Sequence, residues 1–390
     1  MNWRRKSERS WGQSGMKSEW KSEKIGNVVD IRRGASPRPI HKFLTNTGMP
    51  WVKIADATSD FSRYLRKTNE YIIDEGIAKS VVVDPGTLIV SNSATPGLPK
   101  IMKIEACVHD GWLVFANYKG ITRDFLYYKF IDIRQRLVNQ ANGSVFKNLK
   151  TDIVKDFDIS VPSILTQNKI VGILSKLDEK IELNNAINNN LEQQVSARYK
   201  SLFENFDLTN GVCPKNWGYK ELSTIADIMT GKRPPIKSEV CNQNTPFPIV
   251  GASSIMGFTS KANHIDRILV IGRVGTHGVI QRFNTPCWAS DNTLVITSQY
   301  YEFTNQILHR IDYPSMNRGS TQPLITQGDM KKVVVLVPEK ETLIKFEKFA
   351  NSLMKKWAAN NIENDKLSSL RDTILPKLMS GELDVSIIDL

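Results

Sequence analysis

The sequence predicts a mixed α/β (α+β) protein in which two pseudo-repeated globular domains are separated by two long antiparallel helices forming a coiled coil. Three observations predict this class. The chain aligns with itself, half against half; each half ends in a long segment of heptad periodicity; and short β-branched runs lie between Gly-, Pro- and Asn-rich loops. A chain of 390 residues has room for two or three domains.

The internal repeat is clearest at the start and the end of each half. Residues 20–34 align with residues 217–231 at a constant offset of 197, and both stretches run into a basic, proline-rich turn. Near the end of each half the offset settles at 176, so that Val161 and Pro162 align with Val337 and Pro338. The offset therefore drifts within the globular parts and is constant in the segments that follow them. We infer that loop length varies between the two globular parts, whereas the following segments have one fixed length.

These fixed-length segments, residues 163–206 and about 339–380, have the 4,3 apolar spacing that is typical of long helices with a heptad seam. The repeat places six seam residues at matching positions: Leu177, Asn184, Leu191, Leu353, Asn360 and Leu367. Phe349 and Leu370 are further predicted seam positions. Long one-faced helices need a partner, which favours an intramolecular antiparallel pair over two helices that each pack on their own domain. Asn184 and Asn360 fit a role in fixing the register.

The repeat and the heptads together predict the domain boundaries. In order along the chain these are a basic leader at 1–19 that we expect to be flexible, a first domain at 20–162, a central helix at 163–206, a second domain at 207–338, a distal helix at 339–383 and a C-terminal tail at 384–390.

The charge is concentrated in the globular domains. The chain carries a formal charge of +12, of which the first domain holds +6 and the second +4, whereas the two helical segments hold 0 and +1. A basic excess indicates a polyanionic partner, so the globular domains are the predicted nucleic-acid-binding parts. The sequence has no apolar run long enough to span a membrane, and its four cysteines form no C-x-x-C pair, so we expect a cytoplasmic protein without a membrane or disulfide framework.

Four short runs predict strands in the globular domains: residues 87–91, 157–161, 268–271 and 332–337. A loop with the pattern G-x-x-G-x-x-G follows the third of these, at residues 272–278. It lacks the GK[ST] ending of a nucleotide-binding P-loop, and a helix does not clearly follow it. We favour a loop that contacts the DNA backbone over a nucleotide site.

The motifs that would carry chemistry are missing from the sequence. Arg233-Pro234-Pro235-Ile236 has the prolines of an amine-methyltransferase corner without its polar residue or its aromatic residue. The carboxylates lack the acidic-x-Lys arrangement of a metal-dependent nuclease, the five histidines have no metal-ligand spacing, and no nucleophile motif is present. The sequence therefore predicts a chain that is not an enzyme by itself and binds neither metal nor cofactor.

Two basic α/β domains, each followed by a helix of equal length, resemble the specificity subunit (S subunit) of type I restriction-modification systems. The most specific stretches are VPSILTQNKIVGILSKLDEKIELNNAINNNLEQQ at 161–194 and LRDTILPKLMSGEL at 370–383, which look like the conserved helices of that family. The domain endings at 143–162 and 319–338 also follow the family pattern, and the match covers nearly the whole chain from about residue 20.

The resemblance implies a division of labour. Each target-recognition domain would recognise one half of a split double-stranded DNA sequence, and the helices would set the distance between the halves and dock two methyltransferase (M) subunits. The partners would supply the chemistry: S-adenosylmethionine for adenine-N6 methylation, and ATP and Mg²⁺ for the motor-nuclease (R) subunits.

Arg, Lys, Asn and small polar residues near the predicted loops are the candidates for DNA contact, because such side chains pair with base edges and phosphates. In the first domain they are Arg32, Arg33, Arg38, Lys42, Asn92 and Ser93; in the second they are Lys232, Arg233, Lys237, Arg273, His277 and Arg318.

Two other functions stay open at this point. One is a coiled-coil scaffold whose basic domains bind nucleic acid without sequence choice. The other is a nuclease or methyltransferase that acts alone, against which the missing motifs speak.

Overall fold

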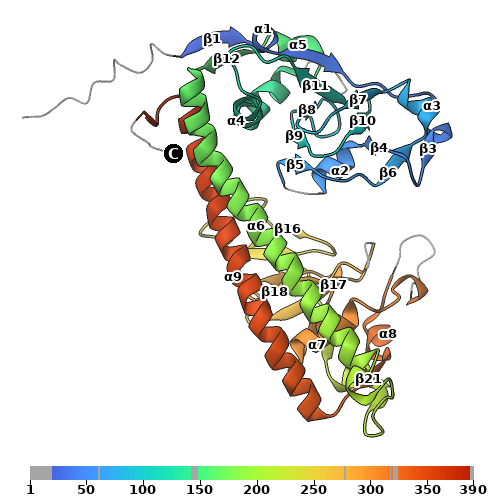
Figure 1. Cartoon of the computed structure of the whole chain (residues 1–390). Helices are drawn as coiled ribbons and strands as arrows, with labels where there is room; N and C mark the ends of the chain where they lie inside the picture. Colours follow the sequence, from blue (N-terminus) through green and yellow to red (C-terminus); the bar gives the residue numbers. More distant parts are fainter. Residues whose placement is uncertain are drawn as a thin grey trace, which may run out of the picture. The chain divides into compact units, whose positions relative to one another are not determined.

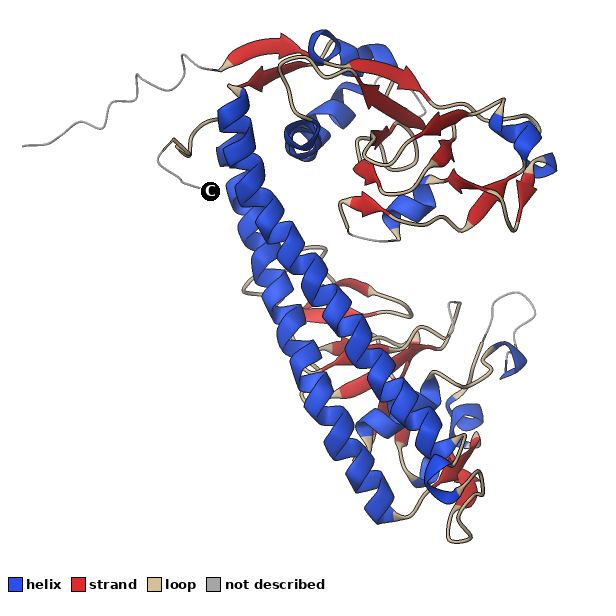
Figure 2. Ribbon diagram, in the orientation of Figure 1, coloured by secondary structure: helices blue, strands red, loops and turns tan. Residues whose placement is uncertain are grey.

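The computed structural model describes residues 20–59, 62–141, 148–275, 278–316, 318 and 324–386 (Figures 1 and 2). The predicted leader at 1–19 lies outside the described residues. The chain divides into two compact units, the first comprising residues 1–185 and 361–390 and the second residues 186–360. Both boundaries fall within long helices, so each unit consists of one globular module and one part of the two-helix pair.

The first module holds two five-stranded sheets and a two-stranded ribbon. The sheet orders are β3-β6-β4-β10-β7 and β2-β11-β8-β9-β5, and the ribbon pairs β1 with β12. The strands are β1 (Lys21–Lys24), β2 (Asp30–Arg33), β3 (Leu44–Thr45), β4 (Met49–Val52), β5 (Tyr64–Leu65), β6 (Glu70–Ile72), β7 (Val81–Val83), β8 (Leu88–Ser91), β9 (Pro99–Met102), β10 (Ala106–Val108), β11 (Trp112–Ala116) and β12 (Asp158–Val161). The helices are α1 (Ile25–Val28), η2 (Ile40–Lys42), α2 (Ile54–Thr58), α3 (Asp74–Ile77), α4 (Arg123–Ala141) and α5 (Thr151–Lys155).

The second module is a smaller version of the first. Its sheets have the orders β14-β20-β17-β18 and β16-β15-β19, and its ribbon pairs β13 with β21. The strands are β13 (Gly218–Glu221), β14 (Asp227–Thr230), β15 (Phe247–Val250), β16 (Ile255–Thr259), β17 (Ile268–Gly272), β18 (Gln281–Phe283), β19 (Trp288–Ala289), β20 (Thr293–Thr297) and β21 (Val334–Val337). The helices are η3 (Asp207–Thr209), η4 (Leu222–Thr224), α7 (Tyr301–Leu308), η5 (Pro314–Met316) and α8 (Gln327–Lys331).

The sheet topology repeats as the sequence does. The order β2-β11-β8-β9 corresponds to β14-β20-β17-β18, and each module has one terminal antiparallel ribbon. The modules share one parallel pair, β4 with β10 and β15 with β19, and the first module has a second, β5 with β9. The predicted class, a mixed α/β chain with two pseudo-repeated domains, is therefore confirmed. The four predicted strands correspond to β8, β12, β17 and β21, and the ribbon strands β12 and β21 each end directly before a proline, which cannot donate to a ladder.

The two predicted long helices are also present. Helix α6 spans Ile164–Phe203 and helix α9 spans Lys340–Met379, each 40 residues long. Both begin within one or two residues of the predicted positions. They run side by side (Figure 1), and the contacts that pair them can be followed within each unit.

In the first unit, the order of contacts shows that α6 and α9 are antiparallel. Asp178 of α6 accepts a hydrogen bond from Arg371 at 2.8 Å. Six residues later in α6, Asn184 donates to Asn364 at 2.9 Å and to Glu363 at 2.8 Å. The partner number therefore falls as the α6 number rises, and the helices run in opposite directions.

In the second unit, the same pairing continues through a buried amide. Asn360 donates to the side-chain oxygen of Asn188 at 2.8 Å, and Asn188 donates to the backbone oxygen of Trp357 at 3.3 Å. Asn360 is 1% exposed, as is Asn184 in the first unit. The two predicted register residues are thus both buried in the seam, but their partners are other residues of the facing helix rather than each other.

The apolar seam residues are buried to different degrees. Leu191 is buried, whereas Leu177, Leu353 and Leu367 are half-buried. Phe349 and Leu370 are 37% and 49% exposed, so the prediction that they belong to the seam is wrong. Their spacing fits a heptad, but 3.6 residues per turn carries these positions away from the partner helix.

Four segments of the first module meet at a point that we call the first hub: the turn after β2, the end of β8, the turn before β11 and the segment before α5. The backbone N–H of Gly34 donates to Trp112 O at 2.8 Å, and that of Asn92 donates to Gly111 O at 2.8 Å. Leu149 N then donates to Asn92 O at 2.7 Å. These bonds hold the loops of three separate strands together.

The second module repeats this arrangement in what we call the second hub. Gly231 N donates to Thr293 O at 3.0 Å, Arg273 N donates to Asn292 O at 2.9 Å, and Ile325 N donates to Arg273 O at 3.0 Å. Arg273 therefore occupies the position that Asn92 occupies in the first hub. The backbone is conserved between the two repeats while the side chain differs.

Each hub requires glycine at the end of its first strand, because another backbone segment passes against it. A Cβ atom on Gly34 would lie 2.2 Å from His109 O, and one on Gly231 would lie 2.1 Å from Ser290 O. A real Cβ atom cannot approach a carbonyl oxygen this closely, so any other residue would push the turns of the hub apart.

A buried polar network attaches the first module to the helix pair of its own unit. Tyr128 of α4 donates to Asp178 at 2.6 Å, and Arg63 donates to Tyr128 at 3.2 Å. Asp178 is 7% exposed and also binds Arg371. Burial raises the pKa of Tyr128, and the neighbouring Asp178 charge raises it further, so the phenol stays protonated and keeps donating.

Removal of the Asp178 carboxylate is expected to destabilise the first unit. Asp178→Ala leaves the guanidinium of Arg371 and the hydroxyl of Tyr128 without their buried partner, which should lower the free energy of unfolding by about 3 kcal/mol. Asp372→Ala is the matched control, because Asp372 pairs with the same arginine at 62% exposure and should cost less than about 1 kcal/mol. Urea denaturation compares the two variants, and equal losses would contradict this account.

Substitution of the hub glycine is expected to destabilise the second unit. Gly231→Ala places a methyl group against Ser290 O and should cost about 1–3 kcal/mol. Gly218→Ala is the control, because a Cβ atom there meets nothing within 4 Å. Thermal unfolding monitored by circular dichroism measures both, and a Gly231→Ala midpoint equal to that of the wild type would show that the close approach is not a constraint.

Candidate nucleic-acid interface

The first hub gathers four of the six residues predicted to contact DNA in the first module. Arg33 ends β2, Arg38 lies in the turn that follows, and Asn92 and Ser93 follow β8. Two of these, Arg33 and Arg38, are exposed, Ser93 is half-buried and Asn92 is 4% exposed. The hub thus presents two arginines at the surface over a buried amide.

The residue that organises these side chains is Asp110, which sequence reasoning missed. Its carboxylate accepts hydrogen bonds from Ser36 at 2.7 Å and from Arg38 at 3.1 Å. Its backbone oxygen accepts from Arg33 Nε at 2.7 Å and from Asn92 at 3.1 Å. Partial burial would raise the pKa of Asp110, but the Ser36 hydrogen bond and the charges of Arg38 and Arg33 outweigh it and lower that pKa overall.

A signal for Asp110 was present in the repeat. Residues 107–114 align with residues 287–295, and an aspartate, Asp110 or Asp291, lies in the middle of both stretches. A cavity of about 210 Å³ adjoins the first hub, and it is lined by Arg33, Asn92, Asn148, Leu149, Lys150 and Thr151. The last four of these also escaped sequence reasoning, because only the fold brings the segment before α5 to β8.

The remaining two candidates of the first module lie elsewhere. Arg32 is exposed, and it donates to Val82 O at 3.3 Å, away from the Asp110 cluster. Lys42 is exposed at the end of η2, beside the other five-stranded sheet. The structure therefore does not bring these two residues into the hub, and their contact with DNA stays a prediction.

In the second module, the hub gathers Lys232, Arg273 and Arg318. Lys232 is exposed, and its backbone N–H donates to Ala289 O at 2.9 Å while its oxygen accepts from Trp288 Nε1 at 2.6 Å. Arg273 is half-buried and its Nη1 lies 3.5 Å from Asp291 O. Arg318 N donates to Leu324 O at 3.1 Å, next to the bridge between Val274 and Leu324.

The other predicted residues of the second module are more scattered. Arg233 follows Lys232 in the same turn and is exposed. Lys237 is exposed and its side chain lies against Gly257 of β16. His277 lies outside the described residues.

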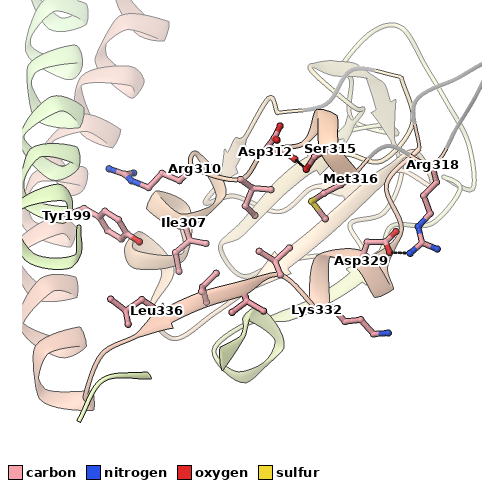
Figure 3. A pocket seen from close by; sticks show the side chains of 14 residues that line it. Tyr199, Ile307, Arg310, Asp312, Ser315, Met316, Arg318, Asp329, Lys332 and Leu336 are labelled. Atoms are coloured by element: carbon pink, nitrogen blue, oxygen red, sulfur yellow. Dashed lines mark hydrogen bonds and ion pairs between the residues drawn. The ribbon is translucent and has the colours of Figure 1, made fainter. Parts of the chain in front are cut away.

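A cavity of about 640 Å³ lies in the second unit between α7, η5, α8 and β21 (Figure 3). Two arginines lie at its opposite ends, and both are engaged: Arg318 forms an ion pair with Asp329, and Arg310 forms one with Glu204. The wall between them mixes apolar side chains, such as Ile307, Met316 and Leu336, with polar ones, such as Asp312 and Ser315 (Figure 3).

Within the described ranges, no group of three or more His, Cys, Asp or Glu residues is placed to hold a metal ion. None of the helices in this part of the chain is both long and apolar enough to cross a bilayer.

Comparison with known proteins fits this geometry. Residues 17–193 and 214–370 match the family described as type I restriction modification DNA specificity domain, one domain for each module and its helix. The type I restriction enzyme MjaIX specificity subunit of Methanocaldococcus jannaschii is 23% identical over 94% of both chains. The HindI specificity subunit of Haemophilus influenzae is 22% identical over 64% of this chain and 74% of its own length.

A solved structure has the same fold. The crystal structure of the S subunit of a type I restriction-modification system from M. genitalium superposes with a TM-score of 0.58 at 19% sequence identity, covering 92% of this chain and 96% of that one. The two family matches together cover most of the sequence, and their limits follow the repeat that the fold displays. The chain accordingly belongs to the type I restriction-modification DNA specificity family and carries two of its target-recognition domains.

Proposed function

We propose that this chain directs a type I restriction-modification complex to a split DNA sequence, with each module recognising one half. The observation that carries the proposal is the repeated hub. The same backbone crossing presents Arg33 and Arg38 in one module and Lys232 and Arg273 in the other. The two loops share a backbone arrangement but carry different side chains. They therefore suit two different short base sequences, because side-chain donors and acceptors, rather than the fold, distinguish base edges.

The helices are the proposed separators and docking surfaces. Each helix is unbroken over 40 residues and belongs to both units, so its length is a property that the two modules share. Several large apolar side chains on these helices are exposed, as expected of a surface that a partner covers: Leu165, Leu183, Ile344, Phe349, Ile362 and Leu370. The proposed occupants are two methyltransferase subunits, with motor-nuclease subunits joining the assembly.

The proposed chemistry belongs to those partners. This chain would act as a non-catalytic subunit, while the methyltransferase subunits use S-adenosylmethionine to methylate adenine N6 and the motor-nuclease subunits use ATP and Mg²⁺. The proposed location is the cytoplasm, and four unpaired cysteines, two of them buried, fit a reducing compartment.

The proposal predicts a methylation pattern that depends on this gene. Single-molecule mapping of N6-methyladenine, in cells with the neighbouring methyltransferase, should give a split motif when the gene is present and lose it when the gene is deleted. The result expected of a scaffold without sequence choice is unchanged methylation, and that result would overturn the proposal.

The separator role predicts that helix length sets the spacer of the motif. Seven residues, one heptad, inserted after Asn189 in α6 and seven opposite them after Ala358 in α9 preserve the seam and add about 10 Å, equal to about three base pairs. The same mapping should show a longer spacer between unchanged half-sites. Seven residues inserted after Asn210, in an exposed turn, are the control and should leave the spacer as it is. Altered half-site bases in the helix variant would contradict the separator role.

A further inference from the structure

We propose that Asp110 is a positioning residue that presents Arg33 to a guanine in the half-site recognised by the first module. The inference rests on the proposed function and names one base that this module reads. It assigns the contact to the outer edge of the Arg33 guanidinium, with guanine O6 and N7 as the acceptors.

The first step is the orientation of Arg33. Its Nε donates to Asp110 O at 2.7 Å, and its Nη2 lies 3.8 Å from the Asp110 carboxylate. One edge of the guanidinium therefore faces Asp110, which leaves the protons of Nη1 and the second proton of Nη2 on its other edge. The side chain is 57% exposed, and no other described residue accepts a hydrogen bond from Nη1. An arginine with two parallel donors exposed has the geometry that pairs with the O6 and N7 acceptors of guanine.

The second step is the rigidity of Asp110 itself. Ser36 holds one carboxylate oxygen at 2.7 Å and Arg38 holds the other at 3.1 Å. The backbone oxygen that receives Arg33 also receives the amide of Asn92, which is 4% exposed and cannot move away without opening the hub. Arg33 is thus held before DNA arrives, and less side-chain entropy remains to be lost on binding.

The third step concerns whether Arg33 contacts a base or a phosphate. A phosphate is held mainly by net positive charge, and a carboxylate within 4 Å of both Arg33 and Arg38 cancels one of their two charges. A guanine edge is neutral and needs donors in fixed directions rather than net charge. Asp110 weakens the first kind of contact and strengthens the second.

The second hub provides an internal comparison. Asp291 occupies the position of Asp110 in the repeat, but only its backbone oxygen approaches an arginine, at 3.5 Å from Arg273 Nη1. Its side chain is exposed and forms no ion pair with another described residue. The two modules therefore share the aspartate, but only in the first does its carboxylate hold arginines.

The test is Asp110→Asn in the full chain, assembled with its methyltransferase subunits. Binding is measured by competition against DNA in which each base pair of the first half-site is varied in turn. The variant keeps the backbone oxygen that binds Arg33 Nε but loses the carboxylate charge beside Arg33 Nη2 and Arg38. Discrimination at one guanine should therefore fall by up to about tenfold, within the roughly 1–3 kcal/mol that a bidentate pair contributes. Preference at the other bases and at the second half-site should stay as in the wild type. Arg33→Lys removes the two parallel donors of the guanidinium and should reduce discrimination at the same base pair.

Asp291→Asn is the matched control and should leave both half-sites unchanged. If Asp110→Asn lowers the thermal midpoint, Ser36→Ala replaces it, since that variant frees one carboxylate oxygen and keeps the charge. Ser36→Ala should reduce discrimination at the same guanine, but by less than Asp110→Asn does.

Three results would overturn the inference, and they are distinguishable. A gain of affinity for every DNA in Asp110→Asn, with a steeper salt dependence and unchanged base discrimination, would make Arg33 a phosphate contact. Unchanged discrimination in Asp110→Asn and Ser36→Ala would remove the positioning role. A wild-type complex without any preferred split sequence would overturn the proposed function itself.

Discussion

The pairing of α6 with α9 is the interaction on which the rest of the structure depends. A 40-residue helix of this kind needs a partner along its length, and each unit supplies one through buried polar contacts. Asn184 binds Asn364 in the first unit, and Asn188 binds Asn360 in the second. Buried amides weaken a seam compared with leucine, but they allow one register only, because a shifted register leaves them without partners.

The modules combine a fixed backbone with variable side chains. At both Gly34 and Gly231 an added Cβ atom would lie about equally close to a carbonyl oxygen, and Asn92 and Arg273 occupy corresponding positions in the two hubs. The hydrogen bonds at the crossing come from the backbone, so the side chains are free to differ without loss of the fold. That separation of scaffold from side chain suits a protein family in which the fold is kept while the recognised DNA sequence differs.

Much of the fold could be predicted from the sequence because its signals are periodic and occur twice. The heptads locate α6 and α9 to within a few residues, and the prolines after Val161 and Val337 mark where the ribbon strands end. The same periodicity misplaces Phe349 and Leu370, which are exposed. The spacing of apolar residues predicts which face of a helix is apolar, but not how wide a part of that face the partner helix covers.

The candidate interface was only partly predictable. Arg33, Arg38 and Asn92 could be selected as donors near loops, but Asp110 could not, because its role depends on the crossing of β2, β8 and β11. Residues that act through a partner distant in sequence carry no local signal. The twelve predicted DNA contacts are therefore a set of polar and basic residues near loops. The fold adds the distinction between those held at a hub, such as Arg33, and those that are not, such as Lys42.

The central claim is that two halves of one chain independently recognise two halves of one DNA sequence. Exchange of the second module, residues 207–338, for the corresponding module of another specificity subunit tests it most directly, with N6-methyladenine mapping as the readout. The account predicts a new second half-site beside an unchanged first half-site and spacer. A motif that does not change, or one in which both halves change together, would contradict it.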